Sequence, residues 1–347
     1  MSLSDEPRII GSMFGLQEPC VVERCHAPFL DGRTILLANA RSGLSFIVDQ
    51  LKPARVWMPS YLCGVMTATL GLRVAEVRFF GVSRHLAMSS LDWTGEVGTG
   101  DVVVFIDYFG FPADSTAVAR VRKKGAWVVE DAAQALLLES AGTFGDFVLY
   151  SPRKWLGVPD GGILRINCAA ELPGADLEPP PSSWWLDSLR ASILRREFDL
   201  NGGEREWFEL FRKCDAGGPT RPYSMSRLSC LLLQHCFDYQ AIAQSRIENY
   251  LFLSGELGDL AVFPGLVAGV VPLAFPIVVG ERDRVRQALF ERDIYPPVHW
   301  PIEGVVPKEF AESHQLAAEI MSLPCDQRYD KADMKRIIAV VREFLRP

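Results

Sequence analysis

Two ionisable residues follow apolar, strand-like segments in the middle of the chain and could act together in catalysis. Asp131 comes directly after the apolar run 127–130, and Lys154 comes shortly after a second run at 147–150. In open α/β sheets, ligands bind beyond the carboxyl ends of parallel strands. A carboxylate there can keep a pyridine nitrogen protonated, and a lysine with a lowered pKa can form a Schiff base. Taken alone, Asp131 is equally well explained as a helix N-cap.

The order of short motifs strengthens the catalytic interpretation of Lys154. Ser151 lies three residues before this lysine and could donate a hydrogen bond to a phosphate oxygen. A lone Ser-x-x-Lys occurs by chance in many chains, and it would favour an ordinary surface lysine. Here, however, the motif stands in an ordered series: Glu-Asp-Ala-Ala-Gln ending at Gln134, Phe-Gly-Asp at 144–146, Ser-x-x-Lys, and then Gly-Gly at 161–162.

In this order the motifs resemble those of the DegT/DnrJ/EryC1/StrS family, which are pyridoxal 5'-phosphate (PLP) enzymes of the fold-type-I aminotransferase class. The resemblance implies that Lys154 binds PLP, that Asp131 pairs with the pyridine nitrogen, and that Gln134 lies near the phenolic oxygen. It also implies that Ser42 and Gly43 form the family's small-residue turn at the phosphate, where a helix N-terminus offers free N–H groups. A plain N-cap is the alternative for this pair.

The chain departs from the family pattern at two positions near the expected ring. Met58-Pro-Ser-Tyr61 resembles the family's P-S-Y segment, but Cys63 stands where an aromatic or histidine side chain usually stacks on PLP. Tyr61 is the alternative ring contact. Asp107 replaces the histidine of the family's H-L-Y-G, and we include it among the substrate candidates. These departures put a standard nucleotide-sugar substrate in doubt more than they put PLP in doubt.

A third departure concerns the contact between subunits. The family's N-x-R-M-S loop, which reaches a neighbouring subunit's phosphate, appears here as Pro222-Tyr-Ser-Met-Ser226 and lacks the asparagine and the arginine. Arg221 or Arg227 could replace them. The resemblance implies a homodimer with a shared active site, and the apolar helical stretch 225–253 suggests an interface. The alternative is that these helices pack only on their own domain.

Three further residues are candidates for contacts with the substrate. His299 lies in Tyr295-Pro-Pro-Val-His-Trp-Pro301, an unusual segment that suggests a place near the mouth of the site. A buried structural histidine beside Trp300 is the alternative. Arg41 and Arg153 flank the phosphate motifs and could bind an anionic substrate, although solvated arginines explain them equally well.

Strand and helix patterns alternate along the chain and predict an α/β fold. The β-branched run Asp101–Asp107 is typical of a strand buried on both faces of a parallel sheet. We expect a fold-type-I PLP-dependent transferase with a mostly parallel sheet in a large domain. This domain spans residues 1–253, including the N-terminal segment and a helical region at 177–253, and residues 254–347 form a smaller C-terminal α/β domain. Further strands are predicted at 55–58, 74–79, 127–130, 147–150 and 162–166, and helices at 43–51, 64–70, 115–124, 184–198, 204–214 and 331–345. A long helical stretch is predicted at 225–253, either continuous or broken once.

Composition excludes several classes of function. The chain of 347 residues is 48% hydrophobic and 23% charged, with a net charge of −7. We therefore expect a soluble protein with no nucleic-acid partner and no membrane partner. No apolar run reaches the roughly 20 residues of a membrane span. The eight cysteines lack metal-site spacing, so we expect no metal and predict thiols in a reducing cytoplasm.

These observations favour an aminotransferase. Its partners would be a small-molecule amino donor, glutamate or glutamine, and a keto acceptor, a sugar or a small cyclic compound. One alternative is another PLP reaction such as elimination, but family members with that chemistry generally lack the lysine that Lys154 provides. The other alternative is a protein with a PLP fold that binds a ligand without turnover. The sequence leaves the donor, the acceptor and the pathway open.

Overall fold

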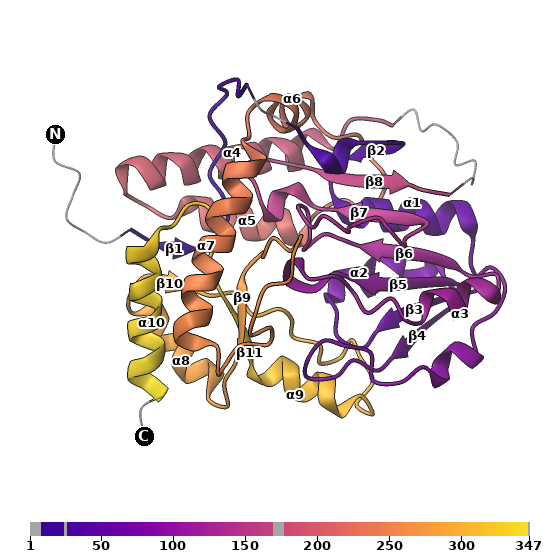
Figure 1. The fold of residues 1–347 in the computed structure, drawn as a ribbon. Coiled ribbons are helices and arrows are strands. Elements are labelled where there is room, and N and C mark those ends of the chain that lie inside the picture. The colour runs from indigo at the N-terminus through magenta and orange to yellow at the C-terminus, as the bar shows by residue number, and fades with distance from the viewer. Residues whose placement is uncertain (1–7, 24–25, 169–176, 346–347) are drawn as a thin grey trace.

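A seven-stranded sheet occupies the right half of the view in Figure 1. The computed structural model describes residues 8–23, 26–168 and 177–345. The strand order is β2-β8-β7-β6-β5-β3-β4, in which β3 to β7 are parallel and β8 is antiparallel to both of its neighbours. The predicted mostly parallel sheet is therefore confirmed. Its strands are β2 (Thr34–Leu37), β3 (Arg55–Pro59), β4 (Glu76–Phe80), β5 (Val102–Ile106), β6 (Trp127–Asp131), β7 (Phe147–Tyr150) and β8 (Gly162–Ile166).

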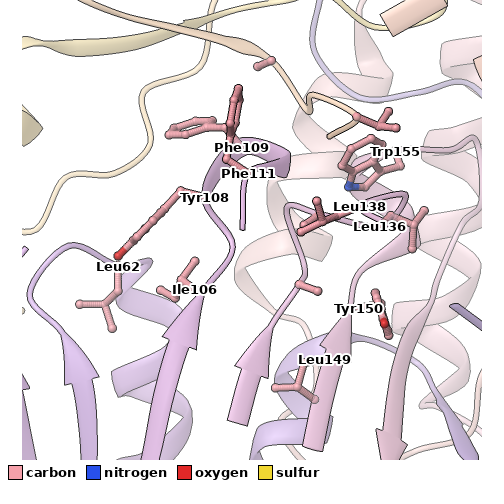
Figure 2. Close-up of a cluster of buried hydrophobic side chains, with 14 of the residues drawn as sticks. Leu62, Ile106, Tyr108, Phe109, Phe111, Leu136, Leu138, Leu149, Tyr150 and Trp155 are labelled. Carbon is pink, nitrogen blue, oxygen red and sulfur yellow. The ribbon is translucent and has the colours of Figure 1, made fainter. Parts of the chain in front are cut away.

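Alternation of side chains explains why the central strands are apolar throughout. Along β5, Val102, Val104 and Ile106 join one buried cluster, while Val103 and Phe105 join a second cluster on the opposite face. Both faces of the sheet are therefore covered, as the continuous β-branched run predicts. Figure 2 shows part of the larger cluster, with aromatic side chains from two loops gathered beyond the strand ends that carry Ile106 and Leu149.

Ten helices are described. They are α1 (Ala40–Leu51), α2 (Gly64–Leu70), α3 (Val118–Lys123), α4 (Ser182–Asn201), α5 (Glu206–Ala216), α6 (Arg227–His235), α7 (Tyr239–Leu257), α8 (Arg282–Phe290), α9 (Ala311–Glu319) and α10 (Lys331–Leu345). The predicted helical stretch at 225–253 is broken once, because the chain leaves the helical path between His235 and Tyr239 and restarts with Asp238 as N-cap. None of the described helices is long and apolar enough to cross a membrane.

The first helix begins earlier than the sequence pattern suggests. α1 starts at Ala40, and its N-cap is Asn39, whose Oδ1 accepts a hydrogen bond from the Ser42 N–H at 3.0 Å. The prediction of Ser42 as N-cap is therefore wrong. Asparagine is a preferred N-cap, so the local sequence contained this signal.

The C-terminal part of the chain is joined to the N-terminus. β9 (Phe275–Val278) and β11 (Ile320–Leu323) form an antiparallel pair, and β1 (Ile10–Gly11) pairs in parallel with β10 (Ile294–Tyr295) (Figure 1). A segment of the N-terminus therefore belongs structurally with the C-terminal elements. The predicted domain boundary at 253/254 falls inside α7 and remains a prediction.

The Gly-Gly turn is required by close packing of two backbones. A Cβ atom on Gly162 would lie 2.1 Å from the carbonyl carbon of Asn39 and 2.3 Å from the nitrogen of Ala40. Backbone atoms cannot move aside as a flexible side chain can. This close approach joins β8 to the start of α1.

We therefore expect Gly162→Ala to lower the free energy of unfolding by about 2–3 kcal/mol, the upper range for overpacking. Urea unfolding followed by circular dichroism measures the change. Gly265→Ala is the matched control, because nothing lies within 4 Å of a Cβ atom at that exposed loop position. A Gly162→Ala protein as stable as the control would contradict this account.

Candidate active site

A cavity of about 660 Å³ lies at the carboxyl ends of the parallel strands. Ile106, Asp131 and Leu149 are directly paired across β5, β6 and β7, and all three line the cavity. This register brings three strand ends to one line at the edge of the sheet. Of the residues predicted from the sequence, the cavity brings together Cys63, Asp131, Gln134, Ser151, Arg153, Lys154 and His299.

Asp131 and Lys154 form the electrostatic centre of this cavity. Burial raises the pKa of Asp131, and the nearby Lys154 ammonium and the Ala133 N–H partly offset that effect. The Ala133 N–H donates to Oδ1 of Asp131 at 3.0 Å, which fixes the carboxylate at the strand end. Since a buried carboxylate is costly without a cation, Asp131 is suited to pair with a positively charged ligand atom.

A short turn presents Lys154 to the cavity. After β7 the chain makes a tight turn at Pro152–Lys154, in which the Lys154 N–H donates to the Ser151 carbonyl at 3.1 Å. Trp155 follows and is fully buried, with the Arg246 guanidinium 4.3 Å from its ring centroid. The turn is thus anchored by Trp155, while the lysine side chain remains exposed.

Gln134 holds the neighbouring loop through one end of its amide. Its Oε1 accepts the Phe109 N–H at 3.1 Å, which fixes which end of the amide is the oxygen. The other end, Nε2, is buried and has no hydrogen-bond partner among the described residues. A buried donor without a partner is costly, so its presence beside the cavity is consistent with a ligand acceptor there.

His299 lies in the wall of the cavity and is neutral. Its Nδ1 is 2.9 Å from Ser322 Oγ, and its ring meets the Phe109 ring edge-on with centroids 5.7 Å apart. Burial, together with the Lys154 ammonium, lowers the pKa of His299 to about 3. The histidine is therefore half-buried, holds a structural hydrogen bond and lines the cavity, so it has features of both sequence interpretations.

Four of the predicted site residues do not line the cavity described here. The Ser42 hydroxyl faces the interior of the fold and contacts the carbonyl oxygens of Pro219 and Arg221, both at 3.1 Å. A Cβ atom on Gly43 would lie 2.5 Å from Leu149, so this glycine allows α1 to pack on β7. The geometry therefore does not support a phosphate contact from Ser42 or Gly43, because both residues serve helix packing.

Tyr61 and Asp107 are the other two. Tyr61 is fully buried, with its ring centroid 5.6 Å from that of Trp300 and 6.0 Å from that of Tyr108. Asp107 is also fully buried, and its Oδ1 accepts the Ala113 N–H at 2.8 Å. Neither side chain reaches the cavity, so the geometry supports neither the ring contact nor the substrate contact.

A buried pair of carboxyl groups behind the cavity was missed by the sequence reasoning. Burial raises the pKa of Asp107 well above its ordinary range, and the neighbouring Glu130 adds to this effect. Glu130 accepts backbone N–H groups from Gly142 and from Gly145, the latter at 2.9 Å. Because Glu130 has these donors, Asp107 is the partner that takes the proton. The pair fixes the loop after β6 rather than contacting a ligand.

The start of α1 provides a second polar wall. Ala40 and Arg41 line the cavity, and the first N–H groups of a helix have no partner within the helix. Arg41 binds the Asp215 carbonyl at 2.9 Å and pairs with the Asp215 carboxylate at 3.6 Å. Burial lowers the pKa of Arg41, the Asp215 carboxylate partly offsets this, and the nearby Arg153 lowers the pKa further. Two guanidinium groups and a helix N-terminus therefore form an anion-binding wall. The Asn-Ala-Arg sequence carried this signal as a cap followed by a cation.

Comparison with proteins of known sequence gives one distant relative. No family model matches the chain. A curated UDP-N-acetyl-3-dehydro-alpha-D-glucosamine 3-aminotransferase of Acidithiobacillus ferrooxidans is 25% identical over 279 residues, which are 70% of this chain and 64% of that protein. The chain thus matches less than two thirds of the length of this curated relative.

Comparison with solved structures identifies the fold. A DegT/DnrJ/EryC1/StrS aminotransferase from Brucella abortus superposes with a TM-score of 0.62 and 20% identity, covering 90% of this chain and 86% of that one. The PMP-form of the sugar aminotransferase Spr1654 from Streptococcus pneumoniae gives a TM-score of 0.67 and 14% identity, covering 90% and 87%. The chain has the fold-type-I fold of these aminotransferases, and the resemblance seen in its motifs is confirmed at the level of the fold.

The buried His299 makes the stability depend on pH. With its pKa lowered to about 3, the folded protein keeps the imidazole neutral, while the unfolded chain protonates it near its ordinary pKa of about 6.5. The unfolded state therefore binds more protons between these values. The contribution of His299 to the free energy of unfolding is therefore fully present above pH 6.5. It falls by up to about 1.4 kcal/mol per pH unit as the pH decreases toward 3.

We expect His299→Asn to remove this contribution. Urea unfolding of both proteins between about pH 7.5 and 4.5 measures it. The free energy of unfolding of the wild-type protein should fall more steeply below pH 6.5 than that of the variant. Parallel curves for the two proteins would show that His299 is not held neutral by the fold.

Proposed function

We propose that this chain is a PLP-dependent aminotransferase. It would transfer an amino group from glutamate or glutamine to a keto group on a sugar or a small cyclic acceptor. The observation that carries the proposal is the placement of Lys154 near the half-buried carboxylate of Asp131 in one cavity. The curated relative is named as an aminotransferase of a nucleotide sugar, and one structural neighbour is described in a PMP form, which supports the same reaction.

The cavity residues fit PLP. Lys154 would hold the cofactor covalently, and Asp131 would bind the protonated pyridine nitrogen, a cation that relieves the cost of burying this carboxylate. The unpartnered Nε2 of Gln134 is a donor suited to the phenolic oxygen. Ser151, Arg153 and the first N–H groups of α1 would bind the phosphate.

When bound, PLP supplies an electron sink for a carbanion on the attached amino compound. The neutral amine of Lys154, once displaced from the cofactor, would take the proton from the Cα atom of the donor and return a proton on the cofactor side. Asp131 would keep the pyridine nitrogen charged throughout. His299 stays neutral, so it places no second cation beside Lys154 and can offer a hydrogen bond to a substrate oxygen.

The alternatives have less support. Family members that catalyse elimination by pyridoxamine chemistry generally lack the lysine. In this chain Lys154 is present, is exposed to the cavity, and is held by the turn that the buried Trp155 anchors. A ligand-binding role without turnover was suggested by the missing stacking residue at Cys63. That position still lines the cavity, and Trp300 lines it as well, so an aromatic ring is available beside the site.

We also propose that the protein is a homodimer with a shared active site. On α4, the side chains of Leu186, Ile193 and Leu200 are 54%, 42% and 54% exposed and recur every seven residues, which places them on one face. Leu231 on α6 is 57% exposed. In contrast, Trp184 and Trp207 are buried within their own chain. The exposed leucines, rather than the tryptophans, are therefore the candidates for the interface.

A cytoplasmic location is the last part of the proposal. The exposed Cys20 and the buried Cys214 and Cys325 are free thiols. Burial raises the pKa of the Cys325 thiol to about 12, so it stays protonated and unreactive. Free thiols of this kind are typical of a reducing compartment.

Covalent attachment at Lys154 is the first prediction. Borohydride reduction of the PLP-loaded protein, followed by peptide mass analysis, should place the cofactor mass on the peptide that contains Lys154. Lys154→Ala should carry no label, because the nucleophile is absent. Lys213→Ala, an exposed lysine paired with Asp187 at 2.7 Å, should be labelled like the wild type. A label on another lysine would overturn the assignment.

The shared site gives the second prediction. Light scattering at micromolar concentration should report twice 38.6 kDa. If Arg221 or Arg227 reaches the partner's phosphate, mixed dimers of Lys154→Ala with an Arg221/Arg227 double variant should regain one intact site of two, about half the activity. A fully active monomer would contradict the dimer. A dimer without such recovery would contradict the shared site.

A further inference from the structure

One wall of the cavity contains none of the motif residues and has a different chemistry. It consists of Phe208 and Phe211 from α5, Arg286 and Phe290 from α8, and Tyr295 from β10, and we call these five residues the collar. The collar joins segments that lie far apart in the sequence. Arg205, just before α5, donates to the Tyr295 hydroxyl at 2.6 Å, and the rings of Tyr295 and Phe290 have centroids 5.2 Å apart.

The collar is aromatic and offers few free hydrogen-bonding groups. The Tyr295 hydroxyl donates to Asp293 Oδ1 at 3.0 Å and accepts from Arg205, so its hydrogen is not free to bind a ligand. Phe208 is 43% exposed although it lines the cavity. A ligand with many hydroxyl groups would lose water contacts here without replacement. A ligand with an apolar ring would instead bury surface that is now exposed to water.

The charge of the collar is limited to one uncompensated cation. Arg205 is neutralised by Asp293, with Nη2 and Oδ1 2.9 Å apart. Arg286 donates through Nε to the Pro296 carbonyl at 3.0 Å and lies 4.6 Å from the Phe290 ring centroid. No carboxylate among the described residues lies within 4.0 Å of Arg286. The adjacent Asp283 is paired with Arg282 at 2.9 Å. One partly buried guanidinium matches one anionic group.

We propose that the collar binds the distal part of the keto acceptor, and that this acceptor is a small cyclic monoanion with an apolar ring, such as an aryl carboxylate. The proposal rests on the proposed aminotransferase function, since it concerns the same cavity. A nucleoside diphosphate sugar fits less well. It brings at least two negative charges and several hydroxyl groups to a wall with one free cation and no free hydroxyl.

Isothermal titration calorimetry with the PLP-loaded protein tests the collar. The probe is 4-phenylbutanoate, an aryl carboxylate that has no ketone and therefore cannot react at Lys154. We expect saturable binding that weakens about tenfold or more in Arg286→Gln, because a charge-assisted contact is lost, and by a similar factor in Phe208→Ser. UDP should show no saturable binding at the same concentrations.

Two variants serve as matched controls. Arg284→Gln removes an arginine from the same helix, where Arg284 is 68% exposed, paired with Glu281 and outside the cavity lining. Val267→Ser removes an apolar side chain that is 61% exposed in the loop before β9, also outside the lining. Both should bind the probe like the wild type. Thermal unfolding of all four variants verifies that each is folded. If Arg286→Gln does not fold, Phe208→Ser still tests the collar, because Phe208 is at an exposed position.

The outcomes separate the collar from the catalytic assignment. Binding of UDP in preference to the probe, or probe binding that is unchanged in both collar variants, would overturn the collar proposal. Neither result depends on chemistry at Lys154, because the probe does not react. Conversely, failure of borohydride to label Lys154 would overturn the proposed function, and calorimetry repeated with the protein as purified, without added PLP, would still report on the collar.

Discussion

The register of three parallel strands is the constraint on which the site depends. Pairing of Ile106 with Asp131 and of Asp131 with Leu149 ends β5, β6 and β7 at one edge. A shift of one residue in β6 would exchange Asp131 for Glu130 on the cavity side, because neighbouring strand residues face opposite sides. The buried apolar residues on both faces oppose such a shift. The core therefore fixes which carboxylate reaches the cavity.

The two adjacent carboxylates show how the fold separates structure from chemistry. Glu130 receives backbone N–H groups from Gly142 and Gly145, which satisfy it inside the protein. Asp131 accepts one hydrogen bond, from the Ala133 N–H, and lies near the Lys154 ammonium. Its carboxylate can therefore still accept a hydrogen bond from a ligand. In the sequence Glu130-Asp131, the glutamate thus stabilises the following loop, and the aspartate belongs to the candidate site.

Patterns within a few residues predicted much of the fold, and long-range contacts explain the failures. The β-branched run at 102–106 and the motif series around Lys154 depend on local residue types, and both predicted the correct elements. The Ser42 hydroxyl, which the sequence predicts at a phosphate, contacts the carbonyl oxygens of Pro219 and Arg221, almost 180 residues away in the chain, and local residue types cannot indicate such contacts. The wall made by α5, α8 and β10 was not predicted for the same reason, since its segments meet only in the folded chain.

The departures from the family pattern have different physical consequences. Asp107 is buried beside Glu130, behind the cavity, so replacement of a histidine there changes the packing of a loop and not the lining of the site. Cys63 does line the cavity, and its side chain is smaller than the aromatic or histidine residue of the family. Trp300, which packs against Tyr61, lines the same cavity from the C-terminal part of the chain. The aromatic surface beside the site is therefore supplied by a residue far from position 63 in the chain, so the loss of a large side chain at Cys63 does not leave the cavity without an aromatic ring.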